Sequence, residues 1–158
     1  MIPIIDRQAT VRGATGRATS EITRPKYHNY WEMKKGYWLL GESLCLGRAL
    51  IVVEGPLDAL VVDQHLGDLD LRGEYSVVSL MGASFTKRQL DRMCALGSEL
   101  ILFLDRDEAG RKATESISSA MQGRMLVEAV NYGMTSLKDP GSTTLQQFRS
   151  LISDTRYV

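Results

Sequence analysis

The chain has 158 residues, 44% of them hydrophobic, and its 19 basic and 19 acidic side chains give a formal net charge of zero. This length and composition predict one globular domain with a sizeable core and exclude a disordered chain. The apolar runs are far shorter than a membrane-spanning helix and no signal peptide begins the sequence, so we expect a cytoplasmic protein with no membrane partner.

Residues 1–48 form the basic part of the chain. They hold eight Lys and Arg against four Asp and Glu, whereas residues 49–158 hold eleven against fifteen. We therefore predict a small basic N-terminal subdomain at 1–48, ahead of an α/β domain at 49–158. Aromatic residues such as Tyr27, Tyr37 and Trp38 interleave with the basic ones, and such a surface can bind phosphates and stack bases. The alternatives are core packing of the aromatics and a merely solvated basic face.

The first strand of the second part ends in acidic residues. An apolar run at residues 50–53 leads into Glu54 and Gly55, and a helix then begins with Pro56. Proline suits the first helical position, because its missing N–H leaves no hydrogen bond unmade there. Asp58 lies in the first turn of this helix. The sequence thus predicts two carboxylates beside one strand end.

A second strand end repeats this pattern. After a strand at 75–80 and a helix at 86–96, the continuously apolar run LILFL at 100–104 is typical of a strand buried on both faces. If the chain stays extended beyond it, Asp105 and Asp107 point the same way and Arg106 points away. Two carboxylates at such a short separation need a proton or a cation between them. Hard oxygen ligands of this kind favour Mg²⁺ or Mn²⁺. The alternative is a surface turn in which an Asp caps the next helix.

Strands and helices alternate from residue 49 onward. A helix at 108–121, a strand at 124–130 and a helix at 143–152 complete the series. This alternation predicts an α/β fold with a central, mostly parallel sheet flanked by helices. Ligands of such sheets collect at the carboxyl ends of the strands, where both acidic motifs stand.

The acidic motifs EGPLDA at 54–59 and LDRDEAGRKA at 104–113 resemble the Toprim domain, the metal-binding module of bacterial-type primases, topoisomerases and some nucleases. The form DxDxAG is similar to that of DnaG-like primases. The resemblance implies a Toprim fold with Mg²⁺ or Mn²⁺ as cofactor. It further implies a catalytic site whose metal ligands are Glu54, Asp105 and Asp107, joined by Asp58 and Asp139.

Asp139 belongs to the segment LKDPG at 137–141, which resembles the Lys-Asp-Pro-Asp element of primases. Gly141 stands in place of the second acid, which leaves one metal position short of a ligand. The N-terminal part is similar to primases as well: residues 2–18 resemble the hairpin that precedes their Toprim domain. The resemblance implies that four residues of this part bind nucleotide or template phosphates, namely Arg17, Lys26, Asn29 and Lys35.

A primase catalytic core is a nucleotidyltransferase that makes RNA primers from NTPs on a single-stranded DNA template during replication, so the resemblance implies these partners. Primases of this type also carry zinc-binding and helicase-binding domains that 158 residues cannot hold, so we expect separate primase pieces or a replicative helicase as partners. Such a short replication protein is typical of a phage or mobile element. A Toprim nuclease and a non-catalytic protein that binds a replication partner are the alternatives.

Overall fold

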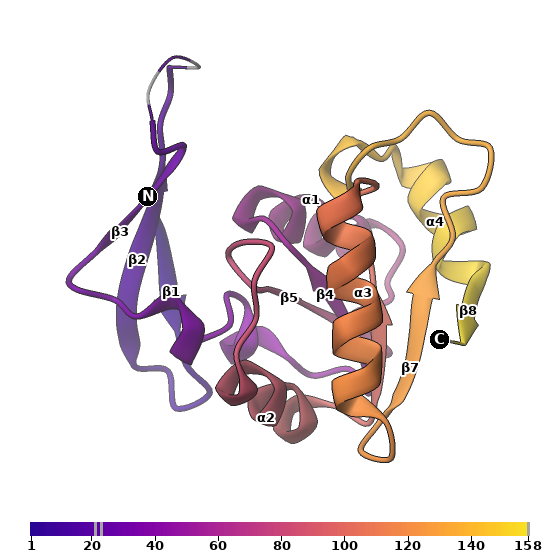
Figure 1. The fold of residues 1–158 in the computed structure, drawn as a ribbon, viewed down its shortest axis with the longest axis horizontal. Helices are drawn as coiled ribbons and strands as arrows, with labels where there is room; N and C mark the ends of the chain where they lie inside the picture. The colour runs from indigo at the N-terminus through magenta and orange to yellow at the C-terminus, as the bar shows by residue number, and fades with distance from the viewer. Residues whose placement is uncertain (21, 23, 158) are drawn as a thin grey trace.

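The computed structural model describes residues 1–20, 22 and 24–157 and arranges their strands in two sheets (Figure 1). The N-terminal sheet is antiparallel and has the strand order β1-β2-β3. Its strands are β1 (Ile2–Ile5), β2 (Val11–Arg17) and β3 (Tyr27–Tyr30). The hairpin expected over residues 2–18 is the β1–β2 pair.

The larger sheet has the strand order β5-β4-β6-β7-β8. The first four are parallel and the last, at the edge, is antiparallel, so the expected mostly parallel α/β sheet is confirmed. The strand bounds are β4 (Ala49–Val53), β5 (Tyr75–Ser79), β6 (Glu99–Leu102), β7 (Leu126–Val130) and β8 (Thr155–Tyr157).

Helices cover both faces of this sheet. The α-helices of the described residues are α1 (Pro56–Asp68), α2 (Lys87–Leu96), α3 (Glu108–Met121) and α4 (Leu145–Ser153). Short 3₁₀ helices are η1 (Lys35–Tyr37), η2 (Glu42–Leu44) and η3 (Pro140–Ser142). None of the helices among the described residues is long and apolar enough to cross a membrane.

The central strand β4 shows how the two faces are built. Its five residues are all buried, and successive side chains point to opposite faces. Ile51 and Val53 pack in a core with residues of α1 and α4, whereas Leu50 and Val52 pack in a second core with residues of α2 and α3. A strand buried on both faces must be apolar throughout, which explains the run of residues 49–53.

Most expected elements are present, with shifted ends. The strand expected at 100–104 pairs only to Leu102, although the Phe103 N–H still donates to the Val52 carbonyl at 2.9 Å. The last helix begins at Leu145 because Thr144 caps it by accepting a hydrogen bond from the Gln147 N–H. Strands β3 and β8 were not predicted, because both are short and neither contains an apolar run.

The segment between the two sheets is fastened to α2 by a buried glutamine. Gln89 is 1% exposed, and its side-chain amide donates to the carbonyls of Trp38 at 3.0 Å and Leu80 at 3.2 Å. Nearby, the Arg92 guanidinium pairs with the buried Glu42 at 2.6 Å. These contacts fix the N-terminal segment relative to the carboxyl end of β5.

Replacing Gln89 by Leu should lower the free energy of unfolding by roughly 1–3 kcal/mol, because buried carbonyls would lose their donor. Gln147 is a matched control, since it occupies the same position of a capping box at the exposed start of α4. Urea denaturation of both Leu variants tests the prediction. Equal losses in the two variants would contradict it.

Candidate metal centre

Two adjacent parallel strands bring the first acidic residues together. β4 and β6 are paired so that Val52 lies opposite Leu102, and their carboxyl ends are therefore at the same edge of the sheet. From β4 the chain crosses first to β5 on one side and later to β6 on the other, the arrangement that opens a crevice in α/β sheets. Across this point the Asp105 N–H donates to Glu54 Oε1 at 3.3 Å.

Asp105 is the most perturbed of the acids. Its pKa is raised to about 7, chiefly by burial and then by the negative charges of Glu54, Asp58, Asp139 and Asp107, in that order of importance. Its Oδ1 atom is buried and has no hydrogen-bond partner among the residues that the structure describes. A buried carboxylate oxygen without a donor is costly, so this atom is suited to a proton or a cation.

Glu54 and Asp58 stand beside it on β4 and α1. Glu54 is 8% exposed, and burial raises its pKa, with further contributions from the charges of Asp107 and Asp58. The pKa of Asp58 is also raised, first by burial and then by the charge of Asp139. Both Asp58 oxygens accept backbone hydrogen bonds, Oδ2 from Gly55 and Oδ1 from Gly141, each at 3.1 Å.

Asp107 stands at the start of α3 and also acts electrostatically on the neighbouring acids. It caps α3, because its Oδ1 accepts a hydrogen bond from the Gly110 N–H at 2.8 Å. Its negative charge still contributes to the raised pKa values of Glu54 and Asp105. Gly110 permits this close packing, since a Cβ atom there would lie 2.0 Å from the Asp105 carbonyl oxygen and 3.0 Å from Glu54 Oε1.

The loop before α4 brings Asp139 to the same edge. A Cβ atom at Gly141 would lie 2.4 Å from Asp58 Oδ1 and 3.6 Å from Asp139 Oδ1. The space beside Gly141, where the resemblance to primases predicts a second acid, is thus occupied by the carboxylate of Asp58. A side chain at residue 141 would therefore require that carboxylate to move.

The donor set suits a hard divalent cation, because it consists of carboxylates alone and includes a buried oxygen without a partner. Asp105 and Asp107 also line a cavity of about 560 Å³ between α3 and β7. Within residues 1–20, 22 and 24–157, no three Asp, Glu, His or Cys side chains are already arranged to hold one ion. Backbone N–H groups engage the oxygens of Glu54, Asp58 and Asp107, so ion binding would require some of these to turn.

The sequence matches the Toprim-like family over residues 51–143, which is more than half of the chain. The chain belongs to this family. The matched range contains both acidic motifs and the Asp139 loop.

Individual relatives agree with this assignment. The chain is 31% identical over 155 residues to a DNA primase of Deinococcus radiodurans, which covers 92% of this chain and 25% of that protein. It is 31% identical over 121 residues to a DNA primase of Clostridium acetobutylicum, covering 72% of this chain and 19% of that one. The zinc-binding and RNA polymerase domains of the Aquifex aeolicus primase superimpose with a TM-score of 0.79 and 26% identity over 99% of this chain and 40% of theirs. This Toprim-like chain therefore spans a quarter or less of the Deinococcus and Clostridium primases.

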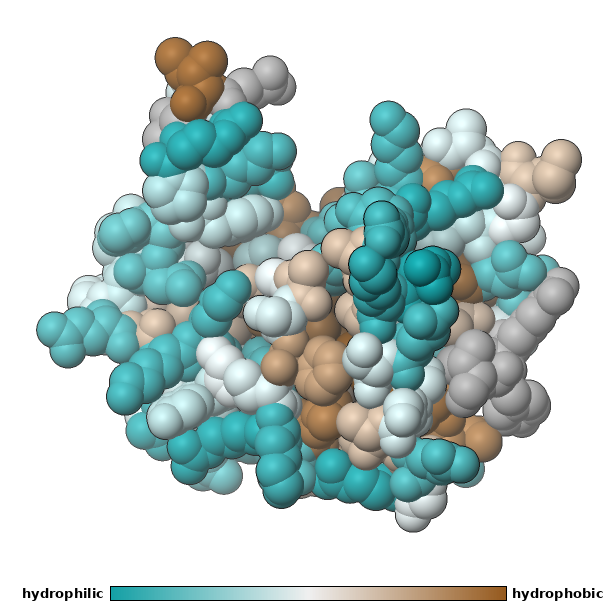
Figure 2. All heavy atoms as spheres, viewed as in Figure 1, coloured by the Kyte–Doolittle hydropathy of each residue, from teal (hydrophilic) through white to brown (hydrophobic). Residues whose placement is uncertain are grey.

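The basic residues expected to bind phosphates occupy two places. The Lys35 ammonium donates to the Met81 carbonyl at 3.4 Å, in a loop whose Gly82 N–H donates to the Glu54 carbonyl at 3.0 Å. Lys35 therefore contacts the loop after β5, and this loop in turn contacts the backbone of Glu54. The other three, Arg17, Lys26 and Asn29, belong to the β2–β3 hairpin. Figure 2 shows the surface hollowed between this N-terminal sheet and the end of α3 that Asp107 caps.

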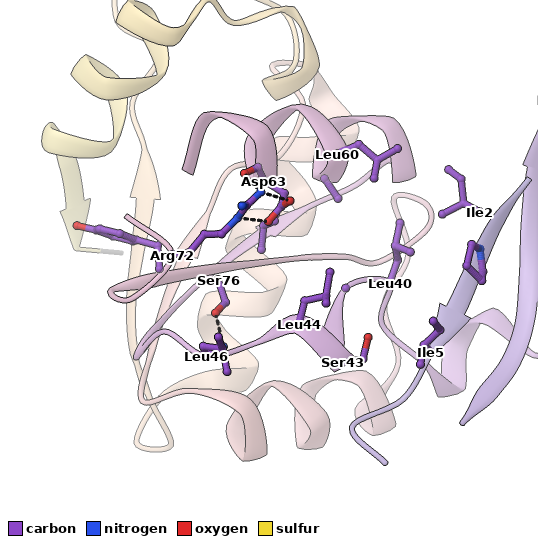
Figure 3. Close-up of a pocket in the computed structure, with 15 residues that line it drawn as sticks. Ile2, Ile5, Leu40, Ser43, Leu44, Leu46, Leu60, Asp63, Arg72 and Ser76 are labelled. Carbon is purple, nitrogen blue, oxygen red and sulfur yellow. Dashed lines mark hydrogen bonds and ion pairs between the residues drawn. The ribbon is translucent and has the colours of Figure 1, made fainter. Parts of the chain in front are cut away.

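A separate cavity of about 550 Å³ lies between the N-terminal sheet, α1 and β5 (Figure 3). Its walls are mainly apolar, with Ile2, Leu40 and Leu60 among them, and an ion pair of 2.7 Å between Asp63 and Arg72 borders it. This cavity is not lined by any of the clustered acids, which are Glu54, Asp58, Asp105, Asp107 and Asp139. It is thus distinct from the acidic centre.

Replacing Asp105 by Asn should stabilise the metal-free protein at pH 8 and change little at pH 4. Because the folded pKa of about 7 lies above the ordinary value of 3.8, the folded protein holds this proton more tightly than the unfolded chain. The stability that the proton contributes is therefore present at low pH and is lost as the pH rises from about 4 to 7.

Thermal unfolding in EDTA across this pH range is the measurement. Asp154→Asn, which removes an exposed carboxylate at the end of α4, serves as the control. If the unfolding temperature of Asp105→Asn and of wild type depends on pH in the same way, then the pKa of Asp105 is not raised in the folded protein.

Proposed function

We propose that this chain is part of a primase catalytic core, a metal-dependent nucleotidyltransferase that synthesises RNA primers on single-stranded DNA during replication. The observation that supports this most is the buried, mutually repelling carboxylate cluster at the crevice of the larger sheet. The identity with bacterial primases over nearly the whole chain supports it as well. In this proposal residues 1–48 form a basic nucleic-acid-binding segment and residues 49–158 form the Toprim domain.

Glu54, Asp105 and Asp107 would hold Mg²⁺ or Mn²⁺, with Asp58 and Asp139 as additional ligands. In nucleotidyl transfer such ions neutralise the triphosphate, activate a 3′-hydroxyl group and stabilise the leaving pyrophosphate. The unpartnered Oδ1 of Asp105 is the oxygen that gains most from an ion, because no hydrogen bond among the described residues competes for it. Glu54, whose pKa is raised by burial, is suited to hold or move a proton beside it.

The basic residues would bind the substrates' phosphates. Lys35, one loop from Glu54, is suited to an NTP phosphate, and Arg17, Lys26 and Asn29 on the hairpin are suited to the DNA template. Since the relatives are much longer, we propose that other primase pieces or a replicative helicase complete the enzyme, in the cytoplasm of a bacterial cell.

Mn²⁺ should stabilise the wild-type protein but not the double variant Asp105→Asn/Asp107→Asn, in which the charged ligands are gone. Saturation at about 100 times the dissociation constant would add about 2.7 kcal/mol to the unfolding free energy. Asp68→Asn/Asp70→Asn is a matched control, because it removes two carboxylates of the same spacing at the end of α1. Equal Mn²⁺ stabilisation of all three proteins would place the ion elsewhere.

The activity itself is tested with single-stranded DNA, labelled NTPs and Mn²⁺. RNA synthesis that the Asp105→Asn/Asp107→Asn variant cannot perform supports a primase. Degradation of the DNA would identify a nuclease instead. Neither product, with Mn²⁺ bound, would show that the chain alone is inactive; a non-catalytic binding protein would then be distinguished from an incomplete enzyme by repeating the assay with the other primase pieces added.

Single-stranded DNA should bind with a steep salt dependence that the double variant Lys26→Ala/Lys35→Ala reduces. Removing one phosphate-binding side chain should lower the slope of log affinity against log salt by about 0.7, so the variant's slope should fall by about 1 to 2 units. Lys87→Ala/Lys112→Ala removes the same charge from α2 and α3. Fluorescence anisotropy at several salt concentrations measures the slopes, and identical changes in both variants would argue against a site on the N-terminal part.

A further inference from the structure

Arg106 lies between the two acids of the DxD motif, and its side chain turns away from them to the loop after β7. Its guanidinium donates to the Gly133 carbonyl at 3.1 Å and also to the Thr135 carbonyl. Its backbone N–H donates to the Lys138 carbonyl at 2.6 Å. One residue thus contacts the loop at its start, its middle and its end.

This loop, residues 131–139, carries Asp139 to the carboxylate cluster. Tyr132 anchors its beginning, where the hydroxyl donates to the Leu104 carbonyl at 2.8 Å, and the buried Leu137 anchors its end. Between these anchors the loop has little apolar packing, since the Met134 side chain is fully exposed. The planar fork of the guanidinium is therefore a principal tie between the middle of the loop and the strand end.

We propose that Arg106 is a positioning residue of the metal centre: it holds the loop that carries Asp139 against the segment that carries Asp105 and Asp107. The inference rests on the proposed metal site. A cation this close to carboxylates would by itself weaken metal binding, because like charges repel. A positioning effect and a charge effect of Arg106 therefore have opposite signs, which makes them separable.

The test compares Arg106→Ala with Arg111→Ala in isothermal titrations with Mn²⁺. Arg111 is a matched control, because it lines the same cavity but its guanidinium forms an ion pair with Glu115 at 2.6 Å. We expect Arg106→Ala to bind Mn²⁺ about tenfold more weakly, as is typical when a group that orients a ligand is removed. Arg111→Ala should bind Mn²⁺ as tightly as wild type or more tightly. Arg106→Lys, which keeps the charge but not the fork, should fall between wild type and Arg106→Ala.

A second measurement follows the loop without metal. In EDTA, trypsin should cleave after the exposed Lys138 faster in Arg106→Ala than in Arg111→Ala, while urea denaturation shows both variants folded. Unchanged or tighter Mn²⁺ binding by Arg106→Ala, or an unchanged cleavage rate at Lys138, would overturn the inference. Absence of Mn²⁺ binding by the wild-type protein would instead refute the metal site itself.

Discussion

Several carboxylates share one edge of the larger sheet and repel one another. Much of the surrounding structure serves to hold them together despite this repulsion. Glu54, Asp58 and Asp105 are all held where burial raises their pKa values, and the charges of Glu54 and Asp58 raise the pKa of Asp105 as well. Backbone N–H groups offset part of the cost of these charges, because they donate to the charged oxygens. The buried Oδ1 of Asp105 has no such donor among the described residues, so the cost of its charge is not offset.

The scaffold makes such crowding possible. Parallel strands β4 and β6 are buried on both faces by helices, so their ends are rigid and cannot separate to relieve the repulsion. The crossover order places the first turns of α1 and α3 at the same edge, and the positive ends of both helices favour negative charge. The N-terminal sheet is joined to this edge through Gln89 and Lys35, so the basic and acidic parts of the chain are coupled by hydrogen bonds.

Local sequence patterns were sufficient for much of this arrangement. Continuous apolar runs identified the buried strands, and the rule that parallel strands end at one edge placed Glu54 near Asp105 from the sequence alone. Contacts between distant segments were not predictable in the same way. The sequence indicates that Arg106 points away from the acids but not that it reaches Gly133 and Thr135, because that depends on the path of a loop without periodic pattern. Strand β8 was missed for the same reason, since its residues gain their structure from pairing with β7.

The contact between Gly141 and Asp58 limits which side chains this loop can carry. Because a Cβ atom at position 141 would lie 2.4 Å from Asp58 Oδ1, a lone change from glycine to aspartate would introduce a steric conflict before it could supply a ligand. Since the atom in conflict is the far end of a flexible side chain, such a change requires the Asp58 carboxylate to turn and to lose the hydrogen bond that it accepts from the Gly141 N–H. A second acid in this loop would thus cost a hydrogen bond between α1 and the loop that carries Asp139, although 83 positions separate the two residues in the chain.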